Sequence, residues 1–314
     1  EYMYDINKLG QDYMYTSKDN MMLMIRRKKD RFISYQRQAE LTYTHELYNG
    51  ISYNAILRNR REYATPYAAF ERIGTNGIIT PVDHYDMTAL ELRFRYARNE
   101  KFYQTRNLRV PITFDALIFN ASHVMAKKDF LGSDYNYHRT DIGMQKRFWL
   151  SAFGYIDIIA KAGKVWTEVP WPLLILPNAN LTYTIQPESY TNMNALEFIN
   201  DEYASWDVTY YMNGNLLNRL PLVKKLKWRE VFCFRGLWGH LTDKNNPMME
   251  GNGEGLYRFP SCTYLMGNTP YMEASVGIEN IFKFLRIDYV WRLSYLNHAD
   301  IQKSGVRMTM VLSF

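Results

Sequence analysis

Hydrolytic chemistry needs a nucleophile held beside a base and an orienting group, and one stretch of the chain collects residues of these types. They are Ser122, His123, Ser133, Asp134 and His138. Nothing in their spacing fixes a mutual geometry, and serine and histidine are ordinary residues of loops. We therefore expect a solvated external loop here and a protein that is not an enzyme.

Two other groups of residues could bind a metal ion. His298 and Asp300 offer two ligands where a zinc site needs three or four, so we interpret them as an exposed turn. Asp83 and Asp86 flank His84 and would hold a cation weakly at most. We expect neither a resident metal nor a cofactor.

The glycines and cysteines give weaker signals. The run GNGEG at 251–255 lacks the lysine and the strand-to-helix setting of a phosphate loop, and we interpret it as the tip of an external loop.

Cys233 and Cys262 could form a disulfide in an oxidising compartment. With only two cysteines, the sequence leaves their pairing open.

The composition favours an all-β protein whose strands have one apolar and one polar face. The chain has 314 residues, of which 16% are aromatic, including 26 tyrosines. Its mean hydropathy is only −0.39. This balance is typical of an outer-membrane barrel, in which every second residue faces lipid and aromatic girdles mark both interfaces, and it also fits a soluble all-β binding protein.

Other classes of protein are disfavoured. No run approaches the roughly 18–20 apolar residues that a spanning helix needs. The formal charge of +6 is spread along the chain and forms no nucleic-acid-binding tract. The chain begins EYMYDINKLG without an initiator methionine or a signal peptide, so we expect it to start inside a longer protein.

Alternation of apolar and polar residues predicts strands with two faces. At 88–98, for example, Leu92 and Phe94 oppose Arg93 and Arg95. Most of the runs are close to the length that crosses a tilted bilayer, roughly 10 residues. The predicted strands are 20–28, 34–47, 51–61, 88–98, 109–119, 139–149, 153–162, 203–213, 225–239, 272–279, 285–295 and 306–314, with a thirteenth possible at 1–6.

The charged face of these strands must find water or opposite charges inside a membrane element. The predicted lumen-facing charges are Arg93, Arg95, Glu279, Arg286, Asp288 and Arg292. They predict either a hydrated interior or a plug held by salt bridges. They say little about a transported molecule.

If the last strand ends in the periplasm, the connections between successive strands lie alternately on the outer and the periplasmic side of the membrane. Every predicted connection longer than about fifteen residues then falls on the outer side, as expected for outer-membrane barrels. These long connections are 62–87, 120–138, 163–194 and 240–269. The predicted periplasmic turns are 48–50, 99–108, a turn near 150, 214–224 and 280–283.

Two clusters are predicted to act at the membrane. A basic cluster at one periplasmic turn is expected to anchor at phospholipid head groups, with an acidic partner as the alternative. It consists of Arg219, Lys224, Lys225, Lys227 and Arg229. The final strands resemble the signal by which outer-membrane barrels are recognised for insertion, and Phe314 is expected to be the true end of the protein. The residues of this signal are Trp291, Met310, Leu312 and Phe314.

Several long phrases resemble one family of outer-membrane proteins from Bacteroidota, a family of unknown function. They are KRFWLSAFGYIDIIAKAGKVW (146–166), LLILPNANLTY (173–183), LNRLPLVKKLKWRE (217–230) and ASVGIENIFKFLRIDYVWRLSYL (274–296). The resemblance covers nearly the whole chain. It implies that residues 1–314 are the carboxyl-terminal barrel of a protein that usually begins with a carboxypeptidase-regulatory-like domain.

A fainter resemblance links the chain to barrels that insert or translocate proteins at outer membranes. In those barrels a long sixth external loop folds into the lumen, and the loop at 163–194 is expected to do so and to be followed by four strands. If the loop at 163–194 corresponds to that sixth loop, the resemblance implies a complete barrel of sixteen strands. The chain would then supply the last twelve or thirteen of them. The family's Arg-Gly-Phe motif is absent, because 163–194 contains no arginine, so insertase activity is not implied.

Two functions remain open. The first is a non-enzymatic subunit of an envelope assembly or translocation complex in a bacterial outer membrane. Its expected partners are outer-membrane lipids, lipopolysaccharide and other outer-membrane proteins or lipoproteins, and no nucleic acid. The second is a pore or transporter for a small solute.

Overall fold

The computed structural model describes most of the chain. The described residues are 1–10, 12–16, 26–28, 32–47, 49–74, 78–105, 109–249, 252 and 255–310. Leu312 and Phe314 of the predicted insertion signal lie outside these ranges, as do most of the predicted strand 20–28 and most of the GNGEG run.

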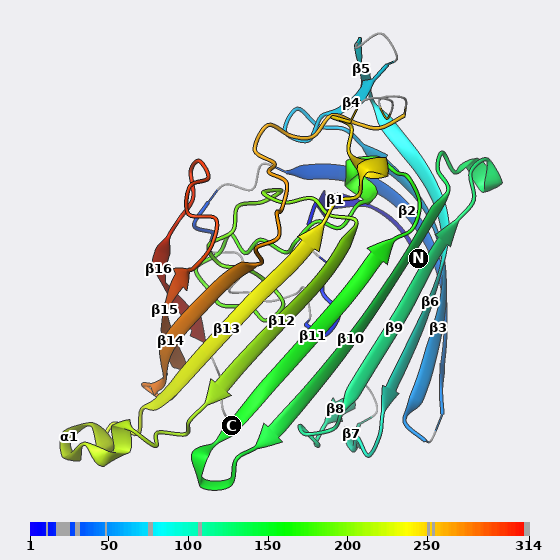
Figure 1. The fold of residues 1–314 in the computed structure, drawn as a ribbon. Helices are drawn as coiled ribbons and strands as arrows, with labels where there is room; N and C mark the ends of the chain where they lie inside the picture. Colours follow the sequence, from blue (N-terminus) through cyan, green and yellow to red (C-terminus); the bar gives the residue numbers. More distant parts are fainter. Residues whose placement is uncertain are drawn as a thin grey trace.

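Twelve strands form one antiparallel sheet in which neighbours in sequence are neighbours in space. The sheet curls around an interior that several loops enter (Figure 1). In the described part of the chain β1 and β16 do not pair, so the sheet is an open, curled wall. Its strands are β1 (Tyr2–Lys8), β2 (Ile33–Glu46), β3 (Ile51–Tyr63), β6 (His84–Ala97), β9 (Ile118–Ala126), β10 (Tyr137–Trp149), β11 (Tyr155–Val165), β12 (Glu202–Tyr211), β13 (Arg229–His240), β14 (Tyr271–Ile281), β15 (Leu285–Arg292) and β16 (Ser304–Met310).

The remaining elements are short. Two hairpins leave the wall, β4 (Phe70–Ile73) with β5 (Ile79–Val82) and β7 (Phe102–Gln104) with β8 (Arg109–Pro111). The helical elements are η2 (Phe130–Gly132), η3 (Ser151–Phe153), η4 (Trp171–Leu173), η5 (Leu217–Arg219), α1 (Pro221–Lys224) and η6 (Asp243–Asn245). None of the described helices has the length and apolar character needed to cross a membrane.

The alternating pattern located most of the wall and failed at one place. The predicted strand 109–119 is wrong: 109–111 belongs to the small hairpin, and β9 occupies 118–126. Pro111 lacks the N–H that a continuous ladder would need there. Ser122 and His123 therefore lie in a strand of the wall, and the connection predicted over 120–138 shortens to 127–136.

The connections differ between the two ends of the wall, though less cleanly than predicted. The end that carries 127–136 is called the loop end, and it holds the three longest connections, 9–32, 166–201 and 241–270. The opposite end is called the turn end. The prediction that all long connections share one end is wrong, because 98–117 and 212–228 both lie at the turn end and exceed about fifteen residues. They carry the β7–β8 hairpin and α1.

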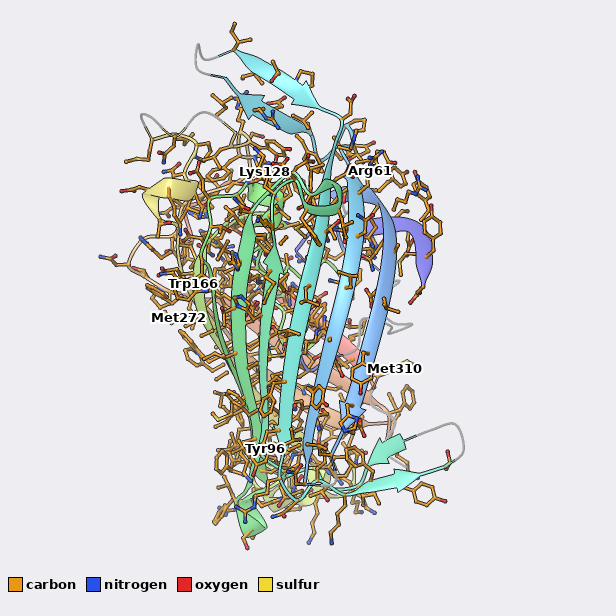
Figure 2. The ribbon with its side chains drawn as sticks, turned by 90° about the vertical axis from the view of Figure 1, so that its right-hand side faces the viewer. Arg61, Tyr96, Lys128, Trp166, Met272 and Met310 are labelled. Carbon is orange, nitrogen blue, oxygen red and sulfur yellow. The ribbon has the colours of Figure 1, made fainter. Side chains whose placement is uncertain are left out.

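The two faces of the wall have opposite character, as the alternation predicted. Large apolar side chains point away from the interior along the middle of the strands, and Figure 2 shows Arg61 and Lys128 near the loop end and Tyr96 near the turn end. The exposed apolar set includes Leu41, Leu57, Leu92, Phe94, Ile142, Met144, Phe234, Val276, Tyr289 and Met308. The inner face carries the charges, and the described loops cover much of it.

Candidate functional site

The interior is filled on one side by the connection between β11 and β12, residues 166–201, here called the plug loop. Trp171, Phe198 and Ile199 of this loop are at most 1% exposed. The Trp171 ring meets Phe70 at 6.0 Å edge-on, and Phe70 stacks on Tyr257 at 5.6 Å, so three loops join in one apolar cluster. This cluster lies at the loop end of the interior.

The plug loop folds back on itself before it meets the wall. Ile175 and Asn200 exchange two backbone hydrogen bonds of 2.9 and 3.1 Å. Asn180 and Tyr190 form a second closure, in which the Asn180 N–H donates to the Tyr190 carbonyl at 2.8 Å. The expectation that this loop enters the interior agrees with the structure. Five strands follow it, as in the alternating runs of the sequence, and not the four that the resemblance implied.

The tip of the plug loop is held from both sides by charged groups of the wall. The backbone N–H groups of Thr191 and Asn192 donate to the buried carboxylate of Glu273 at 2.9 and 2.6 Å. From the other side, Arg307 donates to the Thr191 carbonyl at 3.1 Å and to the Asn192 side chain at 2.6 Å. Hydrogen bonds to ionised groups are stronger than neutral ones, so these contacts fix the position of the tip.

A buried ion pair holds the last part of the plug loop. Arg292 donates both terminal nitrogens to Glu197, at 2.6 and 3.0 Å, and both side chains are at most 1% exposed. His298 Nδ1 lies 2.7 Å from the same carboxylate, and its ring stacks on Tyr264 at 3.8 Å. The interpretation of His298 as an exposed turn residue is therefore wrong, because it locks the β15–β16 connection onto the plug loop.

The ionisation of Glu197 follows from these contacts. Burial alone would raise the pKa of its carboxyl group. The hydrogen bonds from Arg292, the Asn194 backbone and His298 outweigh that effect and hold the pKa below its ordinary value of 4.5. The carboxylate therefore contributes stability that is lost only as the pH falls through this depressed pKa.

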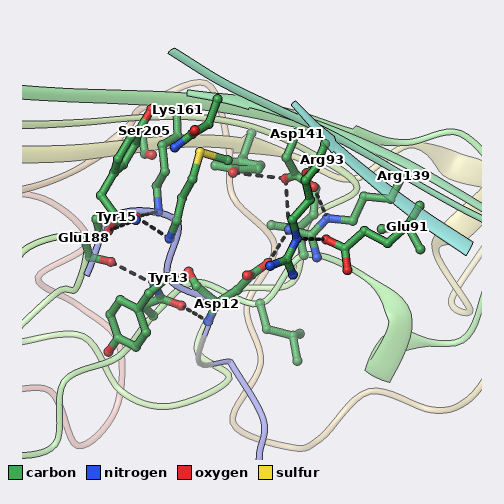
Figure 3. Close-up of a pocket in the computed structure, with 18 of the residues that line it drawn as sticks. Asp12, Tyr13, Tyr15, Glu91, Arg93, Arg139, Asp141, Lys161, Glu188 and Ser205 are labelled. Carbon is green, nitrogen blue, oxygen red and sulfur yellow. Dashed lines mark hydrogen bonds and ion pairs between the residues drawn. The ribbon is translucent and has the colours of Figure 1, made fainter. Parts of the chain in front are cut away.

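Glu188 connects the plug loop to a second segment inside the wall. Its side chain is fully buried and lies 2.8 Å from Lys161 Nζ of β11. The backbone N–H groups of Met14 and Tyr15 donate to it at 2.9 and 2.7 Å, and the Thr16 hydroxyl donates at 3.0 Å (Figure 3). One carboxylate thus fixes three parts of the chain. Residues 12–16 are called the inner strap from here on.

The start of the inner strap is held by an amide and an arginine. Asn178 Oδ1 accepts the Asp12 N–H at 2.8 Å, and Asn178 Nδ2 donates to the Asp12 carbonyl at 2.6 Å. Arg139 lies 2.6 Å from the Asp12 carboxylate and 2.7 Å from that of Asp141. Gly143 of the wall provides the room for the strap, because a Cβ there would lie 2.4 Å from Met14 Sδ.

Beside the strap and the plug loop lies a polar cavity of about 900 Å³. Its lining extends from Leu174 of the plug loop to Arg147 and Asp157 near the turn end. Arg58 lies 3.0 Å from Glu40 and 3.4 Å from Glu91. Cations and carboxylates of the lining neutralise each other pairwise, so the cavity can hold water and polar groups without a strong preference for either sign of charge.

The six predicted lumen-facing charges lie on the inner side of the wall and have ionic partners. Only Arg292 contacts the plug loop. The nearest ionic contacts are Arg93–Glu91 at 2.5 Å, Arg95–Glu100 at 2.6 Å, Arg286–Asp288 at 2.7 Å, Arg292–Glu197 at 2.6 Å and Glu279–Arg229 at 4.0 Å.

Sequence reasoning missed the residues that hold the plug loop and the strap most firmly. Arg235 donates to the carbonyls of Gln186 and Ser189 in the plug loop, at 3.0 and 3.1 Å. Arg235, Glu273 and Arg307 point inward in predicted strands, so the alternation that revealed Arg292 could also have revealed them. Glu188 lies in a loop with no periodic signal, and its backbone adopts a positive φ of 59°. Only the folded arrangement brings Glu188 to Lys161.

The residues considered for hydrolytic chemistry are dispersed. Ser122 lines the cavity, whereas His123 is on the outer face, where its Nδ1 lies 2.9 Å from Thr140 Oγ1 and its ring is 5.8 Å from that of His138. Asp134 instead accepts the Asp86 backbone N–H at 2.7 Å. The Ser133 hydroxyl donates to the Tyr135 carbonyl at 3.2 Å.

The residues considered for metal and disulfide chemistry are likewise engaged elsewhere. The Asp86 carboxylate accepts two hydrogen bonds from Arg61, at 2.6 and 2.7 Å. Within the described ranges, no three His, Cys, Asp or Glu residues gather as a metal site would require. Cys233 and Cys262 are both free thiols.

Comparison with known proteins identifies the family. The family model described as the C-terminal domain of a family of unknown function, DUF5686, matches residues 11–250. The chain belongs to this family. No curated protein matches the sequence.

The fold of this DUF5686 domain has a counterpart among solved structures. The crystal structure of BamA from Haemophilus ducreyi lacking POTRA domains 1–3 is similar, with a TM-score of 0.52 at 10% sequence identity. The match covers 89% of this chain and 55% of that one, so the chain spans about half the length of the BamA chain. The similarity concerns the fold alone.

The Glu188 contacts predict a specific effect on the inner strap. Substitution Glu188→Gln removes the charge that neutralises Lys161, and breaking a buried pair of this kind costs about 3–5 kcal/mol. We expect the amide hydrogens of Met14 and Tyr15 to exchange much faster in the variant, as measured by hydrogen–deuterium exchange. Glu91→Gln, which removes a cavity carboxylate that does not contact the strap, should leave their exchange unchanged. Equal protection in Glu188→Gln would refute this role.

The depressed pKa of Glu197 predicts a pH window. At pH 7, Glu197→Gln should lower the temperature at which the folded form loses its gel mobility, because Arg292 is left without its charge partner. The difference from the native protein should begin to shrink below about pH 4.5, where the unfolded chain takes up a proton, and should vanish once the pH falls below the depressed pKa of the folded carboxyl group. Glu71→Gln, at an exposed pair with Arg258, should show neither effect. A difference that stays constant from pH 7 to pH 3 would exclude this contribution.

Proposed function

We propose that this chain is a transmembrane barrel wall of a bacterial outer membrane and a non-enzymatic subunit of an envelope assembly or translocation complex. The observation that carries the membrane placement is the outer face of the sheet. Its middle is apolar on neighbouring strands: Phe234, Val276 and Tyr289, on the adjacent strands β13, β14 and β15, are each at least 40% exposed. Water would make such a continuous surface unfavourable, whereas lipid would not.

The polar groups of the outer face gather at the loop end, which supports the same placement. Arg61 and Asp86 form a pair at 2.6 Å there, and Lys164 and Glu202 form another at 2.5 Å. His240 ends β13 at the same border. Charges at a membrane boundary reach water and head groups, so this border marks one membrane interface. The three longest connections lie at the same end, which favours the external side for it and the periplasm for the turn end.

The filled loop end supports an assembly or translocation role over an open pore. The apolar cluster around Trp171 and Phe70 covers the interior on that side, whereas the polar cavity reaches residues near the turn end. A solute would have to displace the plug loop to pass. The likeness to outer-membrane assembly barrels supports the same choice, and the finer expectations of a sixteen-stranded closed barrel and of partner lipoproteins remain predictions.

A pore for a small solute is the second candidate, and the cavity itself favours it. Paired charges such as Arg147 with Asp157 keep the lining hydrated. Planar-bilayer recordings separate the two candidates: the plugged protein should show little conductance. Steady conductance in the native protein, equal to that of Glu188→Gln, would favour the pore.

The complex is tested by co-purification. Gentle solubilisation of native membranes, followed by affinity purification of the full-length protein, should recover other outer-membrane proteins or lipoproteins in fixed proportion. Depletion of the protein should change the composition of the outer membrane. Recovery of the protein alone, with an unchanged outer membrane, would count against an assembly role.

The membrane placement predicts an effect that depends on depth. Met144→Arg puts a cation on the outer face in the middle of β10 and should destabilise the folded form by about 2–4 kcal/mol in a bilayer, whereas a change near the interface costs about 0–1 kcal/mol. His138→Arg, on the same face at the loop end of the same strand, is the matched control. Urea unfolding in lipid vesicles measures both, and equal small costs would contradict the placement.

A further inference from the structure

We propose that residues 214–228 form a lipid-binding foot that selects anionic phospholipid head groups at the turn end, an inference that rests on the proposed membrane placement. The segment connects β12 and β13 and contains η5 and α1. It projects sideways from the lower end of the wall, away from the enclosed interior (Figure 1). A segment in that position would lie along the periplasmic leaflet.

The apolar side chains of the foot have no cover within the chain. Leu222 is 85% exposed, and Leu216, Leu220 and Leu226 are each at least 50% exposed. Phe282, in the neighbouring β14–β15 turn, is 79% exposed. Exposed leucines at the end of a membrane wall gain free energy by entering the boundary between head groups and acyl chains.

The charge of the foot is of one sign. Residues 212–229 contain five cations and no Asp or Glu. Among the described residues, Arg219, Lys224, Lys225 and Lys227 have no ion pair, and only Arg229 approaches a carboxylate, that of Glu279 at 4.0 Å. Cations beside exposed leucines match the phosphates of anionic lipids, each contributing about 1 kcal/mol near a charged surface.

The foot is a built structure, because the wall holds it in place. Glu230 interrupts the apolar pattern of β13, and its buried carboxylate accepts the N–H groups of Leu216, at 3.0 Å, and Leu217. Asn215 donates to the Ala152 carbonyl at 2.8 Å, and Asn280 donates to the Lys227 carbonyl at 2.7 Å. The neighbouring turns thus fix both ends of the segment, so its leucines and lysines are presented together.

The occupant is lipid rather than an acidic protein, because cations and exposed leucines alternate along one short segment. Lys224 and Lys225 directly precede Leu226, and Lys227 follows it. An acidic protein groove would satisfy the lysines but leave Leu222 without an apolar partner, whereas the edge of a leaflet offers both environments side by side. The bound lipid would be a phosphatidylglycerol-like or cardiolipin-like molecule.

The test uses the full-length protein in nanodiscs of phosphatidylethanolamine with a minor fraction of phosphatidylglycerol. The phosphatidylglycerol that remains bound after detergent extraction is counted by native mass spectrometry. The native protein should retain it well above its bulk fraction. Reversal of three charges, Lys224→Glu with Lys225→Glu and Lys227→Glu, should lower this enrichment roughly tenfold or more. The neutral version, with Gln at the same positions, should give an intermediate loss and guards against misfolding of the first.

The matched control reverses three exposed lysines of the loop end, Lys127, Lys128 and Lys303, and should retain the enrichment. Equal retention in the foot variants would overturn the lipid site while leaving the barrel intact. Absence of enrichment in the native protein would overturn it in favour of an acidic protein partner. Failure of the native protein to enter nanodiscs would overturn the membrane placement, and the lipid site with it.

Discussion

The structure depends on the cost of leaving a charge unpaired inside the wall. Alternation in the strands brings Arg292, Arg307 and Glu273 to the inner face, where each side chain is nearly or fully buried. A buried charge without a partner destabilises a protein by several kcal/mol. The plug loop supplies the partners through Glu197 and through its own backbone groups. The wall and the plug loop therefore stabilise each other, and the filled interior is part of the fold.

The same pairing shapes what the interior can do. The last part of the plug loop is held by Glu273, Arg292 and Arg307 of β14, β15 and β16, while the inner strap, held by Glu188, borders the cavity. The apolar cluster lies at the loop end, and paired charges keep the remaining cavity wet.

Much of the wall could be predicted from the sequence because a strand repeats every two residues, and the inward charges such as Arg286 and Asp288 followed from the same parity. Where no periodicity exists, prediction failed. The path of 166–201 through the interior, the partnership of Glu188 with Lys161 and the contact of His298 with Glu197 depend on residues far apart in sequence. At 109–119 the error was different: the alternation was present but no wall strand formed. Pro111 cannot donate the hydrogen bond that a continuous ladder needs there, and 109–111 pairs in the β7–β8 hairpin instead.

Backbone hydrogen–deuterium exchange of the full-length protein in lipid bilayers tests most directly whether the plug loop is held inside the wall. Residues 189–201 include Thr191 and Asn192, whose backbone N–H groups donate hydrogen bonds to Glu273. We expect this segment to be protected from exchange about as strongly as β13. Its protection should be far above that of β5, in the β4–β5 hairpin at the loop end. Exchange of 189–201 as fast as that of an unstructured peptide would contradict the mutual dependence of wall and plug loop.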